Sequence, residues 1–332
     1  MDIERIDRYS MYKKIVLFLI ILISVFSLTS CKKNIKKAYK DFGNISEEFC
    51  EIPGLDTKFV PQGMSYNEQH NLLFIVGYNS DDTASPIYVL DSKGNEIQRV
   101  TFKLESGKEY TGHAGGIVSF NDIVFVSSGK KVYKLDVNKI LSANYNECIN
   151  VDKTTKVDLD GATLFVYNNI LFVTEFYYPK KYETDLSHYI QTSNGTNKAL
   201  AFGYMINEEE VSGLESNIPL CAVSIPDKVQ GIYVKNDVIY FSTSYGRNND
   251  SYLYKYQNIL LNDPRDSYLY NDLNLPLYII DEKDRISSLL APSMSEGICF
   301  LNDKLLILFE SGAKKYRLTT KCEVYYIWES NY

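Results

Sequence analysis

Short apolar segments alternate with polar turns from about residue 47 onward, and the alternation repeats along the chain. In each copy a glycine or another small residue opens an apolar strand, a turn rich in Asn and Asp follows, and a second, strongly apolar strand comes next. There are five copies. The first starts at Gly63, and the other four occupy residues 116–127, 163–174, 231–242 and 297–308. Because Asn and Asp tolerate positive φ angles, these turns predict β-hairpins.

Each copy continues with further strands of similar type. The predicted third strands are residues 86–91, 131–136, 199–206, 252–257 and 323–329. The predicted fourth strands of the first four copies are residues 96–104, 153–159, 219–225 and 276–280. The last copy reaches the end of the chain without a fourth strand, whereas residues 48–52 form an unassigned strand before the first copy. The pattern therefore predicts that this N-terminal strand completes the last unit.

Repeated four-stranded antiparallel units without helical periodicity between them predict an all-β fold, a β-propeller. Five units are visible, so the prediction is five blades. Six is the alternative, because residues 176–198 are long enough to contain an irregular blade. A pair of separate β-sandwiches is the competing architecture. Closure by the N-terminal strand would remove the open sheet edges that otherwise favour aggregation.

The first 30 residues have a different pattern, which is typical of a targeting segment. Basic residues precede an apolar stretch, residues 15–28, that is short for a membrane-spanning helix. The sequence Leu-Thr-Ser-Cys at residues 28–31 resembles the lipobox of bacterial lipoproteins. The resemblance implies cleavage before Cys31, acylation of its thiol and attachment to the extracytoplasmic side of the cell membrane. An uncleaved signal anchor and a start at Met11 are open alternatives.

The predicted organisation is a signal peptide at residues 1–30, a lysine-rich tether at residues 31–46 and a propeller domain at residues 47–332. The lysines of the tether either lie against anionic headgroups or belong to a solvated linker. The whole chain has 35 basic and 42 acidic residues and a net charge of −7. This balance provides no cationic surplus for a phosphate backbone and argues against nucleic acid as a partner.

Cysteine spacing does not indicate a metal site. Apart from Cys31, the cysteines are Cys50, Cys148, Cys221, Cys299 and Cys322. They form no CxxC pair, and the chain has only three histidines, so a structural zinc site is not expected. Five is an odd number, so at least one thiol is unpaired or pairs between molecules.

Propeller topology places the candidate site. The starts of the first strands, the ends of the second strands and the connections from second to third strands all lie on one face. The long insertions are such connections: residues 79–85, 176–198, 246–251 and 311–321. The polar side chains before the first strands are Gln62, His113, Asp160, Gln230 and Glu296. Those at or near the ends of the second strands are Tyr78, Glu175, Tyr245, Arg247 and Glu310. We expect both sets to surround the mouth of the central channel.

These residues indicate two kinds of chemistry. Convergence of Asp160, Glu175, Glu296 and Glu310, with the amide oxygens of Gln62 and Gln230, would offer the hard oxygen ligands that Ca²⁺ accepts. His113 beside those carboxylates would favour its imidazolium form and could act as a general acid or base. The alternative is that the polar groups pair with one another and hold the blades together.

One short motif adds a family resemblance. Glu296 in the run Ser-Glu-Gly-Ile resembles the Glu-Gly that opens a blade in the gluconolactonase and regucalcin family. The resemblance implies a metal-ligand role for Glu296. It covers a few residues per blade, and glutamine occupies the equivalent position Gln62, so the lactonase activity of that family is not carried over.

Two classes of function follow. The first is a surface-tethered module that binds a small molecule, glycan or protein on the insertion-loop face, through Gln62, Tyr78, Gln230, Tyr245 and Arg247. The loop tyrosines Tyr177, Tyr178, Tyr182 and Tyr189 are further recognition candidates. The second is a metal-dependent hydrolase or lyase that uses the polar ring and His113. A GxSxG elbow, a glycine-rich phosphate loop and an HExxH helix are absent from the sequence, so the binding module is the prediction.

Overall fold

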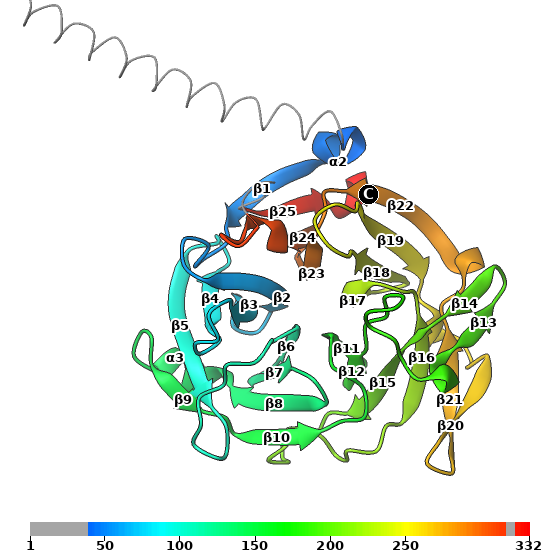
Figure 1. Ribbon diagram of the computed structural model, residues 1–332, viewed down its shortest axis with the longest axis horizontal. Coiled ribbons are helices and arrows are strands. Elements are labelled where there is room, and N and C mark those ends of the chain that lie inside the picture. The colour runs from blue at the N-terminus through cyan, green and yellow to red at the C-terminus, as the bar shows by residue number, and fades with distance from the viewer. Residues whose placement is uncertain (1–38, 317–322) are drawn as a thin grey trace, which may run out of the picture. The chain divides into compact units, whose positions relative to one another are not determined.

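The computed structural model describes residues 39–316 and 323–332, and the propeller comprises Ile45–Tyr332 (Figure 1). The predicted signal peptide, the lipobox with Cys31 and the lysines of the tether at positions 32–37 lie outside the described residues, as does Cys322. Among the helices of the described ranges, none combines the length and the apolar composition that crossing a membrane requires.

The chain folds into five β-sheets that are arranged as blades around a common axis (Figure 1). The first blade contains β2 (Phe59–Asn67), β3 (Leu72–Asn79), β4 (Ile87–Asp91) and β5 (Glu96–Lys103), with β9 (Cys148–Asn150) parallel to β5. The second contains β6 (Gly116–Phe120), β7 (Ile123–Ser127), β8 (Lys131–Asp136) and β10 (Lys153–Lys156). In each blade the first three strands of the sequence repeat follow one another outward from the innermost strand.

The third blade is the largest. It contains β11 (Thr163–Tyr167), β12 (Ile170–Thr174), β15 (Ala199–Met205), β16 (Cys221–Ile225), β21 (Leu273–Ile279) and β20 (Asp266–Tyr270). The fourth contains β17 (Val229–Lys235), β18 (Val238–Thr243), β19 (Ser251–Gln257) and β22 (Arg285–Ala291). The fifth contains β23 (Ser295–Leu301), β24 (Lys304–Phe309), β25 (Glu323–Trp328) and β1 (Ser46–Glu51).

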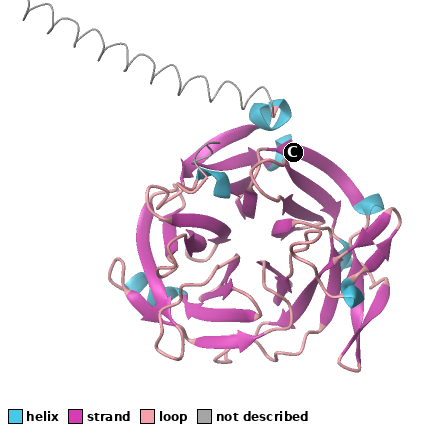
Figure 2. Ribbon diagram, in the orientation of Figure 1, coloured by secondary structure: helices cyan, strands magenta, loops and turns pink. Residues whose placement is uncertain are grey.

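Strands dominate the described residues, and the helices are short (Figure 2). The α-helices are α2 (Lys40–Ile45) and α3 (Val137–Ser142). The 3₁₀ helices are η1 (Leu186–His188), η2 (Ile259–Leu261), η3 (Glu282–Asp284), η4 (Glu310–Gly312) and η5 (Glu329–Asn331). The hairpin β13 (Ile190–Thr192) and β14 (Gly195–Asn197) forms a separate two-stranded sheet in the longest insertion.

The five-bladed prediction is confirmed, including closure of the last blade. Strand β1 pairs antiparallel with β25, with Ser46 opposite Ile327 and Glu51 opposite Glu323. The six-bladed alternative is wrong, because residues 176–198 contain only the β13–β14 hairpin and η1. The two-sandwich alternative is also wrong, since the sheets surround one axis (Figure 1).

One predicted strand belongs to a different blade. Residues 276–280 were expected to be the fourth strand of the fourth blade, but β21 pairs parallel with β16 of the third blade. Strand β22 takes the expected place and pairs antiparallel with β19. The physical reason is burial: Leu275 and Leu277 of β21 pack into the apolar cluster between the second and third blades.

The hairpin turns have the backbone conformation that the Asn-rich pattern predicts. The first turn residues have positive φ angles of 49° at Asn121, 49° at Asn168, 53° at Asn236 and 54° at Asn302. Such angles are typical of the tight turns whose twist matches that of paired strands.

The innermost strands approach one another closely around the axis, in the order β2, β6, β11, β17, β23 and back to β2. A Cβ atom on Gly297 would lie 2.5 Å from the backbone nitrogen of Met64 in the neighbouring blade. A Cβ atom on Gly231 would lie 2.7 Å from the carbonyl oxygen of Glu296. Glycine is therefore required at these two positions because neighbouring backbones are in contact.

Apolar side chains fill the spaces between neighbouring blades. Four clusters lie between the first and second, second and third, third and fourth, and fifth and first blades. Phe74, for example, is fully buried between the first and second blades. Phe309, on β24 of the fifth blade, is also fully buried. This packing holds the blades at fixed positions, so side chains at the ends of their inner strands are brought together at the axis.

Candidate functional site

A cavity of about 1040 Å³ lies where the inner strands begin and the second strands end, and we call it the axial cavity. All ten residues that the topology placed at the channel mouth line it: Gln62, Tyr78, His113, Asp160, Glu175, Gln230, Tyr245, Arg247, Glu296 and Glu310. They come from all five blades and the connections between them. The structure therefore brings the ten residues to one place.

Two carboxyl groups of the axial cavity influence each other's ionisation. Glu296 is on β23 and is only 2% exposed, whereas Glu310, which follows β24 directly, is half-buried. Burial raises the pKa of Glu296 well above its ordinary value, and the negative charge of Glu310 raises it further. Burial also raises the pKa of Glu310 to about 7, although a hydrogen bond from Gln62 and the charge of Lys315 oppose this rise. The pair consequently retains a proton near neutral pH.

His113 stacks on an aromatic ring instead of pairing with a carboxylate. Its Nε2 atom is 2.6 Å from Oε1 of Gln62, and its ring centroid is 4.4 Å from that of Tyr78. Burial lowers the pKa of His113 to about 4, and the charge of Lys315 lowers it further. The imidazolium form was expected only for a ring beside the carboxylates, and His113 contacts Gln62 and Tyr78 instead. The neutral ring donates its Nε2 proton to Gln62.

Glu175 has partners of its own. Its Oε1 atom accepts hydrogen bonds from Nδ1 of His188, at 2.8 Å, and from the backbone nitrogen of Leu200, at 2.9 Å. His188 is at the end of η1 in the longest insertion. This contact could not be predicted from the sequence, because a lone histidine in a long connection has no motif around it.

The carboxyl groups do not fit the predicted calcium site. Within residues 39–316 and 323–332, no three His, Cys, Asp or Glu side chains are grouped so that they could hold a metal ion. Glu175 is paired with His188, and Asp160 is exposed. The prediction of Asp160, Glu175, Glu296 and Glu310 as joint Ca²⁺ ligands, and with it the metal role that the family resemblance implied for Glu296, lacks a matching donor set.

Lysine side chains on the insertion loops cover aromatic rings of the axial cavity. Lys315 donates from Nζ to the hydroxyl of Tyr78, at 2.9 Å, and lies 5.2 Å from the ring centroid of Tyr316. Lys181 lies 5.5 Å and 5.4 Å from the ring centroids of Tyr182 and Tyr245. These distances are in the range of cation–π contacts. Both lysines and Tyr316 were missed, although they lie in connections that were recognised as insertions.

The four loop tyrosines differ in exposure. Tyr182 lines the axial cavity, and Tyr178 stacks on Tyr245 with ring centroids 3.6 Å apart. Tyr177 is only 3% exposed and belongs to the apolar cluster between the third and fourth blades, so it is not accessible as a recognition residue. Tyr189 packs edge-on against Tyr177.

Comparison with known proteins adds little to this description. No known protein family and no curated protein matches the sequence. Among solved structures the chain is similar to BamB from Moraxella catarrhalis, with 11% identity, a TM-score of 0.35, and coverage of 82% of this chain and 83% of that one. It is also similar to Sqt1 from Saccharomyces cerevisiae, with 7% identity, a TM-score of 0.38, and coverage of 79% and 83%. The propeller assignment rests on the strand order itself.

Proposed function

We propose that this protein is a binding module, anchored to the extracytoplasmic side of a cell membrane through Cys31, that holds a hydrophilic ligand with an amino group in its axial cavity. The observation that carries the proposal is the carboxyl pair of buried Glu296 and half-buried Glu310 within a cavity lined from all five blades. The anchor is supported by the lipobox-like sequence at residues 28–31.

The charges around the axial cavity favour a cationic group. The acidic residues that line it are Asp158, Asp160, Glu175, Glu183, Asp185, Glu296 and Glu310. The basic residues that line it are Lys130, Lys181, Arg247 and Lys315. An ammonium group placed beside Glu296 and Glu310 would displace the proton that the pair retains, because a nearby positive charge favours the ionised form of a carboxyl.

Aromatic rings of the cavity already accept ammonium groups from the chain itself. Lys181 lies over Tyr182 and Tyr245, and Lys315 lies over Tyr78. A ligand amine would find the same kind of surface, since the faces of tyrosine rings attract cations. The combination of acidic and aromatic groups thus supports an amine-bearing ligand over an anionic one.

Calorimetric titration with a lysine tripeptide tests the proposal. Gly-Lys-Gly and the same peptide acetylated on its lysine side chain are the probes, with the N-terminal amine blocked in both. Acetylation removes the charge and keeps the chain length. We expect the unmodified peptide to bind and the acetylated peptide to bind at least about ten-fold more weakly, as a lost charge-assisted contact implies.

Two variants locate the binding. Glu296→Gln should weaken binding of the unmodified peptide by a similar factor. Asp272→Asn, at the exposed tip of the β20–β21 hairpin, removes one charge elsewhere and should leave binding unchanged. Equal affinity of the two peptides, or full binding by Glu296→Gln, would exclude the axial carboxyl pair as the binding group.

A hydrolase or lyase without a bound metal is the second candidate. The observation that favours it is the raised pKa of Glu310, about 7, in a cavity that a substrate could enter. Such a carboxyl suits general acid–base catalysis near neutral pH. Turnover of a γ-lactone by the wild-type protein, lost in Glu310→Gln, would favour this candidate over the binding module.

A further inference from the structure

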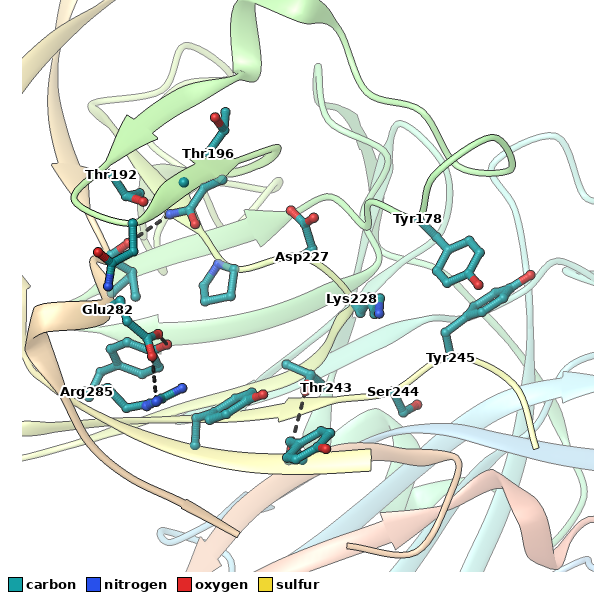
Figure 3. A pocket seen from close by; sticks show the side chains of 18 of the residues that line it. Tyr178, Thr192, Thr196, Asp227, Lys228, Thr243, Ser244, Tyr245, Glu282 and Arg285 are labelled. Carbon is teal, nitrogen blue, oxygen red and sulfur yellow. Dashed lines mark hydrogen bonds and ion pairs between the residues drawn. The ribbon is translucent and has the colours of Figure 1, made fainter. Parts of the chain in front are cut away.

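A second cavity, of about 820 Å³, lies between the third and fourth blades, and we call it the interblade cavity. Strand β19, the β13–β14 hairpin and the connections after β16 and β18 contribute its lining. Tyr245 lines this cavity as well as the axial cavity. Figure 3 shows Tyr178 and Tyr245 together on one side, and Thr192, Glu282 and Arg285 toward the other.

Tyrosines of β19 form an aromatic surface in the interblade cavity. Tyr252, Tyr254 and Tyr256 occupy alternate positions, so their side chains share one face of the strand. The rings of Tyr252 and Tyr254 are nearly parallel, at 6°, with centroids 5.7 Å apart. Tyr252 is 39% exposed, whereas Tyr256 is buried. Because the two rings are stacked and Arg285 lies 5.7 Å from the ring centroid of Tyr254, the exposed ring of Tyr252 is the surface that the C–H face of a pyranose can cover.

The groups around this surface are mainly neutral amides and hydroxyls. The polar uncharged residues that line the cavity, apart from tyrosines, are Thr192, Asn194, Thr196, Asn197, Thr243, Ser244 and Asn249. Ser244 is only 2% exposed, and its hydroxyl has no hydrogen-bond partner among the described residues. An unsatisfied hydroxyl beside a cavity favours a ligand that supplies hydroxyl groups.

The charged groups of the interblade cavity disfavour an anionic ligand. Arg285 pairs with Glu282, with Nη2 2.5 Å from Oε1, and Lys228 lies 5.6 Å from the ring centroid of Tyr178. The acidic residues Asp227, Asp250 and Glu282 outnumber these two basic residues in the lining. A phosphate group would therefore meet a net negative charge here. An apolar peptide would find few aliphatic partners, since Pro226 and Ile280 are the aliphatic residues in the described lining.

We propose that the interblade cavity binds a neutral saccharide, with a pyranose ring on Tyr252 and its hydroxyls hydrogen-bonded to the β13–β14 hairpin. The combination of an exposed aromatic ring, neutral donors and acceptors, and an excess of acidic over basic side chains is the pattern that carries the assignment. It is independent of the amine site, because Tyr252 and Tyr254 do not line the axial cavity.

Saturation-transfer NMR and calorimetry with neutral oligosaccharides test this proposal. The probes are cellotetraose, maltotetraose, chitotetraose, mannotetraose and galactotetraose. At least one should bind at millimolar concentration, with the strongest transfer to the C–H protons of one ring face. Tyr252→Ala should weaken that binding by about ten-fold or more, as loss of an aromatic anchor in a pocket implies. Thr196→Val should also weaken it, because the hydroxyl is lost and the shape is kept.

Matched variants make the result specific. Tyr145→Ala, at a tyrosine that is 58% exposed and outside this cavity, should leave saccharide binding unchanged. Glu296→Gln should also leave it unchanged, which separates this site from the axial cavity. The proposal is overturned if none of the five oligosaccharides binds, if Tyr252→Ala binds as the wild type does, or if adenosine monophosphate occupies the cavity in preference to all of them.

Discussion

At the scale of single residues, the carboxyl pair Glu296 and Glu310 makes the folded state sensitive to pH. Burial raises the pKa of both carboxyls, that of Glu310 from 4.5 to about 7. A raised pKa means that the folded protein binds more protons than the unfolded chain between these values. The stabilisation from protonated Glu310 is therefore fully present below pH 4.5 and is lost as pH rises through about 7.

Replacing Glu310 with Gln should remove this dependence, because glutamine is neutral at every pH. As pH rises from 4.5 to 7.5, the melting temperature of the wild-type protein should fall more than that of Glu310→Gln. The difference should be about 2–4 °C for each kcal/mol of unfolding free energy that the wild type loses through deprotonation of Glu310. Differential scanning calorimetry over this range provides the measurement. Parallel melting curves for the two proteins would contradict the assignment.

His113 acts in the opposite direction. Its pKa is lowered from 6.5 to about 4, so its contribution to stability is present above pH 6.5 and is lost as pH falls through about 4. This contribution is common to the wild type and Glu310→Gln and cancels in their comparison. The sequence argument assumed a carboxylate beside His113, but the ring stacks on Tyr78, and burial and the charge of Lys315 lower its pKa.

At the scale of strands, the close approach of the inner strands accounts for the glycine that opens most copies of the repeat. Gly231 and Gly297 leave room for a neighbouring backbone that a methyl group would meet. The repeat itself revealed these positions, the turns and the order of the strands. It did not reveal to which sheet β21 belongs, because an alternating apolar segment fits the edge of either neighbouring blade.

A Gly297→Ala variant tests this packing. Its Cβ atom would lie 2.5 Å from the backbone nitrogen of Met64, so the two strands must separate. We expect a loss of unfolding free energy of about 1–3 kcal/mol or more, as overpacking in a closed core causes. Gly195→Ala is the control, because nothing lies within 4 Å of the added atom. Urea unfolding that shows equal midpoints for the two variants would refute the close-packed ring.

At the scale of the whole molecule, topology predicted where the candidate site lies but not what it does. Ten residues scattered from Gln62 to Glu310 line one cavity because blade order alone fixes which strand ends meet. The contacts of His188, Lys315 and Tyr316 depend on the paths of irregular insertion loops. Those paths follow from tertiary packing that leaves no periodic signal in the sequence.

The proposed anchor is also a property of the whole molecule. Wild-type protein produced in a bacterium should sediment with membranes, and its mass should equal the chain from Cys31 onward plus acyl groups. Cys31→Ser should lose the acyl groups and remain with an uncleaved leader, whereas Cys148→Ser should behave as the wild type. An unacylated wild-type chain in the soluble fraction would refute the anchor.

Proton release on ligand binding tests the central claim most directly. An amine that binds beside Glu296 and Glu310 should expel the proton that the pair retains. Titration of the blocked Gly-Lys-Gly peptide near pH 6, in buffers of different ionisation enthalpy, measures the number of protons released. The account predicts release approaching one proton in the wild type and much less in Glu296→Gln. Binding with the same heat in every buffer would contradict it.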